Sequence, residues 1–432
     1  MSRTLSEWLD WQETLHLSSI DLGLDRVRLV AANLDLLDFP FPVISVAGTN
    51  GKGSSTAMLQ SIYQQAGYKT GVYTSPHLLR YNERIALNGT AASDEVICEA
   101  FEQIDQARGK TSLTYFEFGT LAAAVLFAQQ HVDIAIFEVG LGGRLDAVNL
   151  WDADIALITS IAIDHESWLG NNREDIAIEK AGIMRSGKPV ICGDKHPPAT
   201  IASEADRIGA QLIQRDIAFS LSQSTSAEST EQWQWHDLQR NMSLTLPLPS
   251  LAGAFQLDNA ANVIAAISQL QSRLPVFTQA IEKGLETTEL AGRLQIIASN
   301  PEILVDVAHN PQAAQQLALY LQNHPHSGKN IALFSVLKDK DLQGIISPFK
   351  DIIDQWAIIS LDSERGQSAE QIQTELQKLG INNTKTVNNN FKKAVQDIKN
   401  TVKSKDRVVA FGSFLLVSGV LESLLDHQAK KP

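Results

Sequence analysis

Cysteine is scarce in this sequence, and long hydrophobic runs are absent. The 432 residues include only two cysteines, Cys98 and Cys192, which lie far apart and lack metal-ligand spacing. This excludes a disulfide framework and is typical of a reducing compartment. No run of about 18 apolar residues occurs, so no segment is predicted to span a membrane. Residues 1–12 contain no apolar core of signal-peptide length, and we therefore expect a cytoplasmic protein.

Positive charge is also in deficit. Thirty-six lysines and arginines face 49 acidic residues, which gives a formal net charge of −13. This balance argues against a general nucleic-acid-binding protein, although local basic pockets for phosphate or carboxylate remain compatible with it. The hydrophobic content of 44% is ample for globular cores, and the length predicts two or three domains.

The most informative stretch is residues 43–63. An apolar run at 43–47 stops at Gly48, and the residues that follow are mostly glycine, small or polar, with Lys52 among them. A helical pattern then begins. Strand, glycine loop with lysine and helix together are typical of a phosphate-binding loop, in which backbone N–H groups point at the anion. From this stretch alone, a glycine-rich turn without a ligand is the alternative.

The loop departs from the usual phosphate-loop pattern at two positions. Val46 stands where that pattern has its first glycine, and Gly53 stands where a serine or threonine follows the lysine. The loop is therefore shorter, and its first hydroxyl is displaced to Ser54.

Strand and helix patterns alternate along the chain and predict an α/β fold. An N-terminal phosphate-loop ATPase domain, residues 1–295, is expected to hold a mostly parallel sheet. Alternating polar and apolar residues predict a small antiparallel β subdomain at about 215–251. A C-terminal Rossmann-like α/β domain is predicted for residues 296–432. The main expected strands are residues 69–74, 133–139, 154–163, 303–307, 330–336, 356–361 and 407–411.

Several chemically active residues follow predicted parallel strands, and ligands bind open parallel sheets beyond the carboxyl ends of the strands. Ser75, Glu138, Asp164 and His165 lie at such ends, together with the loop. Ser75 as a turn residue and His165 as a surface histidine are the plain alternatives. Glu138 is costly to bury unless it meets a cation or a donor. These side chains predict a Mg²⁺ site, although an imidazole ligand is unusual for this ion.

Seven motifs, in this order and spacing, give the chain a resemblance to folylpolyglutamate synthases of the Mur-ligase superfamily, which extends from about residue 5 to residue 425. The motifs are residues 47–54, 74–77, 138–146, 164–165, 179–183, 292–293 and 306–311. The shortened phosphate loop is what this family carries. The resemblance implies an ATP-dependent amide ligase. A substrate carboxylate would attack the γ-phosphate of ATP, and the amino group of L-glutamate would displace phosphate from the resulting acyl phosphate.

The resemblance also implies roles for individual residues. Lys180 matches a lysine that is carbamylated in the family, although a helix-surface lysine is the favoured reading from sequence alone. His309 is expected near the incoming glutamate, with a loop-capping role as the alternative. Ser75, Glu138 and His165 are expected as Mg²⁺ ligands, and the carbamate of Lys180 would assist a second Mg²⁺. ATP binding is expected at Thr49, Asn50, Gly51, Lys52, Gly53, Ser54, Asn259, Arg293 and Asp306.

Two further segments, residues 19–24 and 113–117, resemble the pterin-contacting parts of bifunctional members, which also make dihydrofolate from dihydropteroate. Asp21 is expected to accept hydrogen bonds from an aminopterin, with capping of the following helix as the alternative. We therefore expect dihydropteroate, reduced folates, L-glutamate and ATP as substrates of a monomeric enzyme. The expected substrate-binding residues are Ser19, Ile20, Asp21, Leu22, Thr114, Phe116 and Asp146.

Three other functions stay open at this point. A monofunctional folylpolyglutamate synthase shares every motif except the pterin-contacting segments. A Mur-type cell-wall peptide ligase shares the fold, but the phosphate loop starts at Gly48, which leaves no obvious N-terminal domain for a UDP-sugar. A phosphate-loop NTPase that works as a switch does not need a second α/β domain with its own motif at 306–311.

Overall fold

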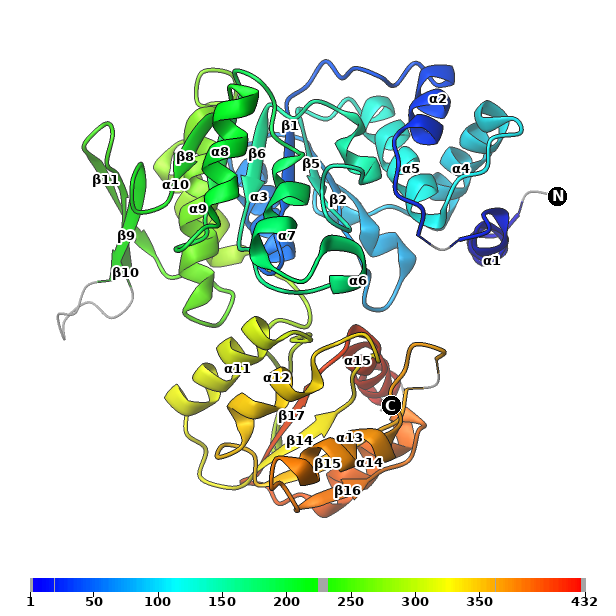
Figure 1. Cartoon of the computed structure of the whole chain (residues 1–432), viewed down its shortest axis with the longest axis vertical. Helices are drawn as coiled ribbons and strands as arrows, with labels where there is room; N and C mark the ends of the chain where they lie inside the picture. Colours follow the sequence, from blue (N-terminus) through cyan, green and yellow to red (C-terminus); the bar gives the residue numbers. More distant parts are fainter. Residues whose placement is uncertain (1–2, 19, 224–231, 362, 429–432) are drawn as a thin grey trace. The chain divides into compact units, whose positions relative to one another are not determined.

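The computed structural model describes residues 3–18, 20–223, 232–361 and 363–428, with side chains as far as residue 424. The chain divides into two compact units (Figure 1). The first is Met1–Ser250 with Gln256–Glu289, and the second is Leu251–Phe255 with Leu290–Pro432. No helix in the described ranges is long and apolar enough to cross a membrane.

The first unit is built on an eight-stranded sheet with the order β4-β3-β2-β5-β1-β6-β7-β8. The strands from β2 to β8 in this order run parallel, and β3 and β4 extend the β2 edge in antiparallel pairs. Strand β1 is central and fully buried, which explains its unbroken apolar sequence. The strands are β1 (Val43–Ala47), β2 (Thr70–Tyr73), β3 (Ile85–Leu87), β4 (Thr90–Ala91), β5 (Ile134–Glu138), β6 (Ile155–Ile158), β7 (Pro189–Cys192) and β8 (Gln211–Gln214).

Helices cover both faces of this sheet, as expected for parallel strands joined by crossovers (Figure 1). Helix α5 is buried along most of its length and starts with a capping box, in which Thr114 and Glu117 bond each other's backbone N–H groups. The helices are α1 (Leu5–Leu15), α2 (Asp25–Asn33), α3 (Lys52–Gln65), α4 (Asp94–Arg108), α5 (Tyr115–Gln129), α6 (Glu166–Leu169), α7 (Arg173–Ala181), α8 (Ala199–Ile208), α9 (Phe255–Gln269) and α10 (Thr278–Thr287), with 3-10 turns η1 (Tyr81–Arg84) and η2 (Ala147–Leu150).

The predicted antiparallel subdomain is present. Its strands β9 (Phe219–Gln223), β10 (Gln232–Asp237) and β11 (Met242–Pro247) pair in the order β11-β10-β9. Trp233 and Trp235 alternate with exposed residues and are buried. The Trp235 indole N–H donates to the carbonyl of Ala261 on α9 at 3.1 Å. This hydrogen bond holds the antiparallel sheet against α9 within the first unit.

The second unit holds a six-stranded sheet with the order β12-β13-β17-β14-β15-β16, parallel except for the β12 edge. Its core contains Phe334, Phe349, Trp356 and Phe411. The strands are β12 (Gln295–Ser299), β13 (Glu302–Val305), β14 (Asn330–Phe334), β15 (Gln355–Ile358), β16 (Thr384–Thr386) and β17 (Arg407–Phe411). The helices are α11 (Pro311–Asn323), α12 (Leu342–Ile346), η3 (Ser347–Phe349), α13 (Ala369–Lys378), α14 (Phe391–Thr401) and α15 (Phe414–Gln428).

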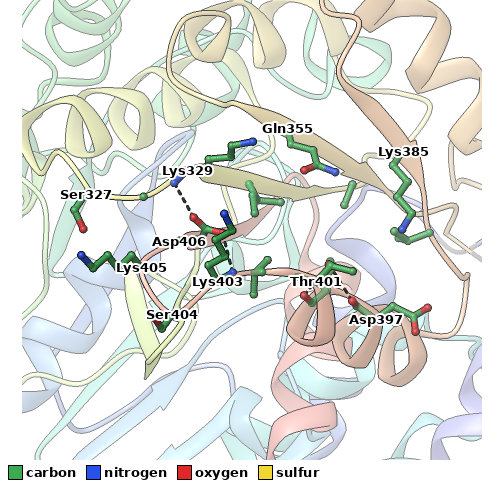
Figure 2. Close-up of a pocket in the computed structure, with 16 residues that line it drawn as sticks. Ser327, Lys329, Gln355, Lys385, Asp397, Thr401, Lys403, Ser404, Lys405 and Asp406 are labelled. Carbon is green, nitrogen blue, oxygen red and sulfur yellow. Dashed lines mark hydrogen bonds between the residues drawn. The ribbon is translucent and has the colours of Figure 1, made fainter.

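A hollow of about 650 Å³ lies at the amino-terminal edge of this second sheet (Figure 2). Its lining includes Lys329, Lys385, Lys403 and Lys405, and the buried Asp406 carboxylate accepts from the backbone N–H groups of Lys329 and Lys403. Strands β14, β15 and β17 begin beside the hollow. It is therefore at the opposite edge from the carboxyl strand ends, where the predicted site residues of this unit lie.

The structure corrects two sequence-based expectations. The strand expected at 154–163 ends at Ile158, because Thr159 and Ser160 turn to bond the phosphate loop. Asp21 does not cap the following helix, since Leu24 is the N-cap of α2 and makes no side-chain cap hydrogen bond.

Candidate active site

The phosphate loop lies between β1 and α3 at the centre of the first sheet. Gly51 caps α3 in the left-handed conformation, with φ of 88°, and supplies no side-chain hydrogen bond. The first-turn N–H groups of Gly53 and Ser54 are therefore left to an anion at the helix N-terminus. The Lys52 ammonium curls back over the loop and donates to the carbonyl of Gly48 at 3.0 Å. The loop thus has the geometry that holds a phosphate chain.

The first half of the loop is held by the segment after β6. The Thr49 N–H donates to the Ser160 carbonyl at 2.7 Å, and the Asn50 N–H donates to the Ser160 hydroxyl at 3.2 Å. The Thr49 hydroxyl bonds the backbone of Ala162 in both directions, at 3.0 Å each. Thr49 and Asn50 therefore shape the loop, and the helix end behind them presents the amides.

Asn259, on α9, packs directly against the loop. A Cβ atom on Gly51 would meet the Asn259 Oδ1 atom at 2.4 Å, so only glycine fits there. The Asn259 amide donates to Gln256, and Gln256 donates to the buried Ser54 hydroxyl at 3.2 Å. These bonds join α3 to α9. The structure thus brings the predicted nucleotide residue Asn259 to the phosphate loop.

Lys180 is buried on α7, with 4% of the residue exposed. Burial, with the nearby Lys52 charge as a second cause, lowers the pKa of Lys180 to about 7, against weaker opposing effects of Asp164 and Asp146. A helix-surface lysine, the favoured reading from sequence alone, is therefore wrong. A large fraction of this amine is neutral near pH 7 and is nucleophilic in that form.

The three predicted metal ligands come from neighbouring strands. Ser75 follows β2, Glu138 is the last residue of β5, and His165 follows β6, so they flank the loop after β1. Glu138 is 6% exposed, as expected of a carboxylate that meets a cation or donors. A hydroxyl, a carboxylate and an imidazole suit an ion that keeps several water and phosphate ligands. Within the described residues, no three His, Cys, Asp or Glu side chains form a metal cluster by themselves.

Asp146 organises the glycine-rich turn after β5. Its carboxylate accepts from the N–H groups of Gly140, Leu141 and Val148 at 2.8–3.0 Å. Burial raises the pKa of Asp146 to about 6, although these hydrogen bonds oppose the shift. A Cβ atom on Gly140 would meet the Phe116 ring at 2.8 Å and Asp146 at 3.3 Å. Phe116 and Asp146, both predicted to bind substrate, therefore both lie close to Gly140 in this turn.

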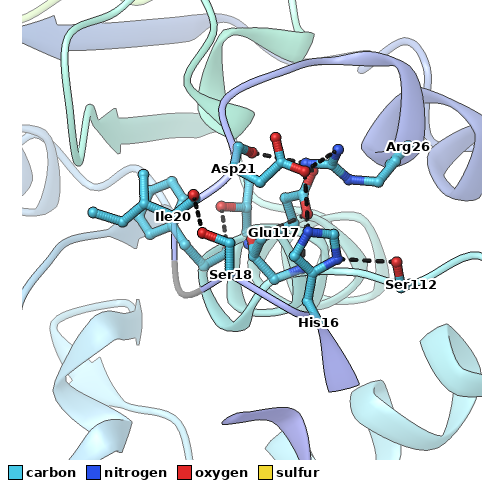
Figure 3. Close-up of polar contacts among 10 residues, drawn as sticks. His16, Ser18, Ile20, Asp21, Arg26, Ser112 and Glu117 are labelled. Carbon is cyan, nitrogen blue, oxygen red and sulfur yellow. Dashed lines mark hydrogen bonds and ion pairs between the residues drawn. The ribbon is translucent and has the colours of Figure 1, made fainter. Parts of the chain in front are cut away.

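The remaining predicted substrate residues lie around the loop between α1 and α2 (Figure 3). Asp21 accepts from His16 at 3.0 Å and from Arg26 at 2.7 Å. Arg26 also reaches Glu117, beside Thr114, at 3.1 Å. Sequence reasoning missed His16 and Arg26, whose partners lie up to 96 residues away. Ile20 and Leu22 flank Asp21 in this loop and are partly exposed, and Ser19 lies outside the described residues.

In the second unit, the predicted residues gather at the carboxyl edge of the sheet. Asp306 is 7% exposed and accepts from the N–H groups of Leu294 and Ala308 at 2.8 Å each. Burial raises its pKa, and the charge of Arg293 opposes this effect. The Arg293 guanidinium lies 5.4 Å from the centre of the Phe414 ring, and His309 packs on the same ring at 5.7 Å. Phe414 has no sequence motif and was missed.

Comparison with known proteins decides the family. The Mur ligase middle domain matches residues 46–267, and the Mur ligase glutamate ligase domain matches residues 292–414. The chain is 43% identical over 420 residues to the dihydrofolate synthase/folylpolyglutamate synthase of Escherichia coli K12, covering 97% of this chain and 95% of that protein. This chain belongs to the dihydrofolate synthase/folylpolyglutamate synthase family of Mur ligases.

Solved structures agree with this assignment. The Escherichia coli FolC structure in complex with DHPP and ADP superposes with a TM-score of 0.91, at 42% identity and over 99% of both chains. The bifunctional folylpolyglutamate synthase/dihydrofolate synthase of Yersinia pestis, complexed with AMPPNP and Mn ion, gives 0.89 at 41% identity over 98% of both chains. The predicted Mur-ligase fold and ATP-dependent ligase class are thereby confirmed for this family member.

Proposed function

We propose that this enzyme adds L-glutamate to dihydropteroate, forming dihydrofolate, and to reduced folates, forming polyglutamates. The observation that carries the proposal is that predicted phosphate-binding and substrate-binding residues lie together in the first unit. The phosphate loop, the buried Lys180 near Lys52, and Phe116 and Asp146 beside Gly140 belong to this unit, and a fixed Asp21 is tied to the N-terminus of α5 through Arg26. A relative that is 43% identical to this chain is named for both activities, and a similar solved structure is a complex with DHPP and ADP.

The chemistry follows from the poor electrophilicity of a carboxylate at neutral pH. The substrate carboxylate oxygen attacks the γ-phosphorus of ATP, ADP leaves, and an acyl phosphate forms. The amine of L-glutamate then adds to the acyl carbon, and phosphate leaves with the C–O bond pair while the amine loses a proton. Lys52 and the first-turn amides of α3 neutralise the phosphate charge during the first step.

Ser75, Glu138 and His165 are the residues that would hold Mg²⁺. A bound Mg²⁺ neutralises phosphate oxygens and orients the terminal phosphate for in-line attack. The carboxylate of Glu138 supplies the negative charge, and its burial strengthens the attraction.

Lys180 is proposed to react with CO₂, so that its neutral amine forms an N–C bond and releases one proton. The carbamate is a carboxylate-like anion beside Lys52, and it would support a second Mg²⁺. The lowered pKa of the Lys180 amine favours the neutral form that this reaction requires. A Lys180→Ala variant should lose activity and regain part of it with acetate, whereas no gain from acetate would contradict the carbamate role.

The nucleotide and glutamate roles of the second unit are part of the proposal. Asn259, Arg293 and Asp306 are proposed to contact ATP. His309 would approach the incoming glutamate, supported by its place beside Asp306 and Phe414. We also propose that the enzyme is monomeric and cytoplasmic.

An ADP-release assay tests the function. ADP should appear with dihydropteroate plus L-glutamate and with tetrahydrofolate plus L-glutamate, and only weakly when either acceptor or glutamate is left out. Turnover with reduced folates alone would reduce the enzyme to a monofunctional folylpolyglutamate synthase.

A further inference from the structure

Arg26 joins two segments that are distant in sequence. Its Nη1 donates to the Asp21 Oδ2 atom at 2.7 Å, and its Nη2 donates to the Asp21 carbonyl at 2.7 Å. The same Nη2 reaches Glu117 Oε1 at 3.1 Å. One guanidinium thus ties the Asp21 loop to the N-terminus of α5 (Figure 3).

The Glu117 end of this link is rigid. Its side chain is 4% exposed, and its Oε2 atom accepts from the Thr114 N–H at 2.8 Å and the Thr114 hydroxyl at 3.0 Å. Its Oε1 atom faces Arg26. Because the capping box fixes Glu117, the guanidinium receives a fixed anchor. The anchor lies one residue from Phe116, so any displacement of Arg26 acts on both segments.

The Asp21 end is held on one side only. Its Oδ2 atom accepts hydrogen bonds from both Arg26 and His16. The other ring nitrogen of His16 is hydrogen-bonded to the Ser112 hydroxyl at 2.9 Å. No hydrogen bond reaches Oδ1 from any described residue, and the side chain is 40% exposed. The carboxylate therefore keeps a fixed orientation while one oxygen stays available to an external N–H donor.

We propose that Arg26 is a positioning residue for the binding of dihydropteroate. This inference rests on the proposed function, because it takes Asp21 as the acceptor for the aminopterin edge. Arg26 holds Asp21 Oδ1 toward the substrate and keeps the Asp21 loop in register with Thr114 and Phe116. Its planar fork is needed for this, because three acceptors lie around one guanidinium. A lysine at the same place would keep the charge but lose that geometry.

Arg28 offers a matched control. It lies on the same helix, is exposed, and its side chain forms no ion pair with any residue that the structure describes. The test compares the full-length wild-type enzyme with Arg26→Met, Arg26→Lys and Arg28→Met. Steady-state ADP release gives kcat and KM for dihydropteroate, L-glutamate and ATP, and circular dichroism checks that each variant is folded.

Both Arg26 variants should raise KM for dihydropteroate about 10- to 100-fold, the range expected for loss of a charge-assisted hydrogen bond. The kcat of both variants at saturating dihydropteroate and their KM for ATP should stay within about 2-fold of the wild type. Arg26 is not proposed to contact either ATP or the reacting carboxylate. Arg28→Met should match the wild type. If Arg26→Met does not fold, Arg26→Lys alone decides.

Two failures are distinguishable. A wild-type enzyme without dihydropteroate turnover overturns the proposed bifunctionality, and the inference with it. A wild type that turns over dihydropteroate, with Arg26 variants whose KM is unchanged or rises equally for all three substrates, leaves the function standing and overturns the positioning role.

Discussion

The buried Lys180 gives a prediction about how stability depends on pH. Its pKa falls from 10.5 in the unfolded chain to about 7 in the folded one. Between these values the unfolded state binds more protons at this site, so the contribution of Lys180 to the free energy of unfolding rises with pH. In the Lys180→Met variant the side chain keeps a similar length and does not titrate.

The size of the effect follows from the two pKa values. From about pH 7 to about pH 9, the free energy of unfolding of the wild type should rise relative to the variant by about 2 kcal/mol, at 1.36 kcal/mol per pKa unit. At pH 7 itself, the variant should be the more stable protein, because it removes a buried amine that is partly charged.

The assay is urea unfolding at both pH values, followed by circular dichroism, in CO₂-free buffer without nucleotide or Mg²⁺. These conditions prevent formation of the carbamate. The exposed Lys110 supplies the control, and a Lys110→Met variant should show no change with pH relative to the wild type. A difference between wild type and Lys180→Met that stays constant from pH 7 to pH 9 would refute the buried, pKa-lowered lysine.

Three other variants test the geometry of the site. Gly51→Ala places a methyl group 2.4 Å from Asn259 at a φ of 88°, and it should weaken ATP binding at least about 10-fold in a titration, with about 1–2 kcal/mol lost in stability. Glu138→Gln removes the carboxylate charge, so it should raise the Mg²⁺ concentration needed for half-maximal activity about 10-fold or more, while an unchanged Mg²⁺ dependence would remove Glu138 from the metal site. Thr114→Ala removes the cap of α5 and should cost about 1 kcal/mol in urea unfolding, with a larger rise in KM for dihydropteroate than for ATP.

Strands, loops and motifs were predictable where local sequence decides them. The strand at 407–411 was predicted with the bounds that β17 has, because a buried parallel strand is an unbroken apolar run. The strand at 154–163 was predicted too long for the same reason. Residues 161–163 are also apolar, and only the bonds from Thr159 and Ser160 to the phosphate loop, more than 100 residues away, end the strand at Ile158.

The site was predictable as a set of motifs but not as an arrangement. Lys180 looked exposed because helical spacing cannot show what packs over a helix, whereas the structure buries it near Lys52. Arg26 carries no motif, and its contact with Glu117 depends on how α2 and α5 meet. Phe414 was missed because it precedes no polar signature, although both Arg293 and His309 pack on its ring.

The measurement that tests the central claim most directly is product analysis by mass spectrometry after incubation with ATP, Mg²⁺, L-glutamate and dihydropteroate. The account predicts dihydrofolate, formed in equal amount with ADP and abolished when L-glutamate is left out. ADP release without a glutamate-containing product, or a product only from reduced folates, would contradict it.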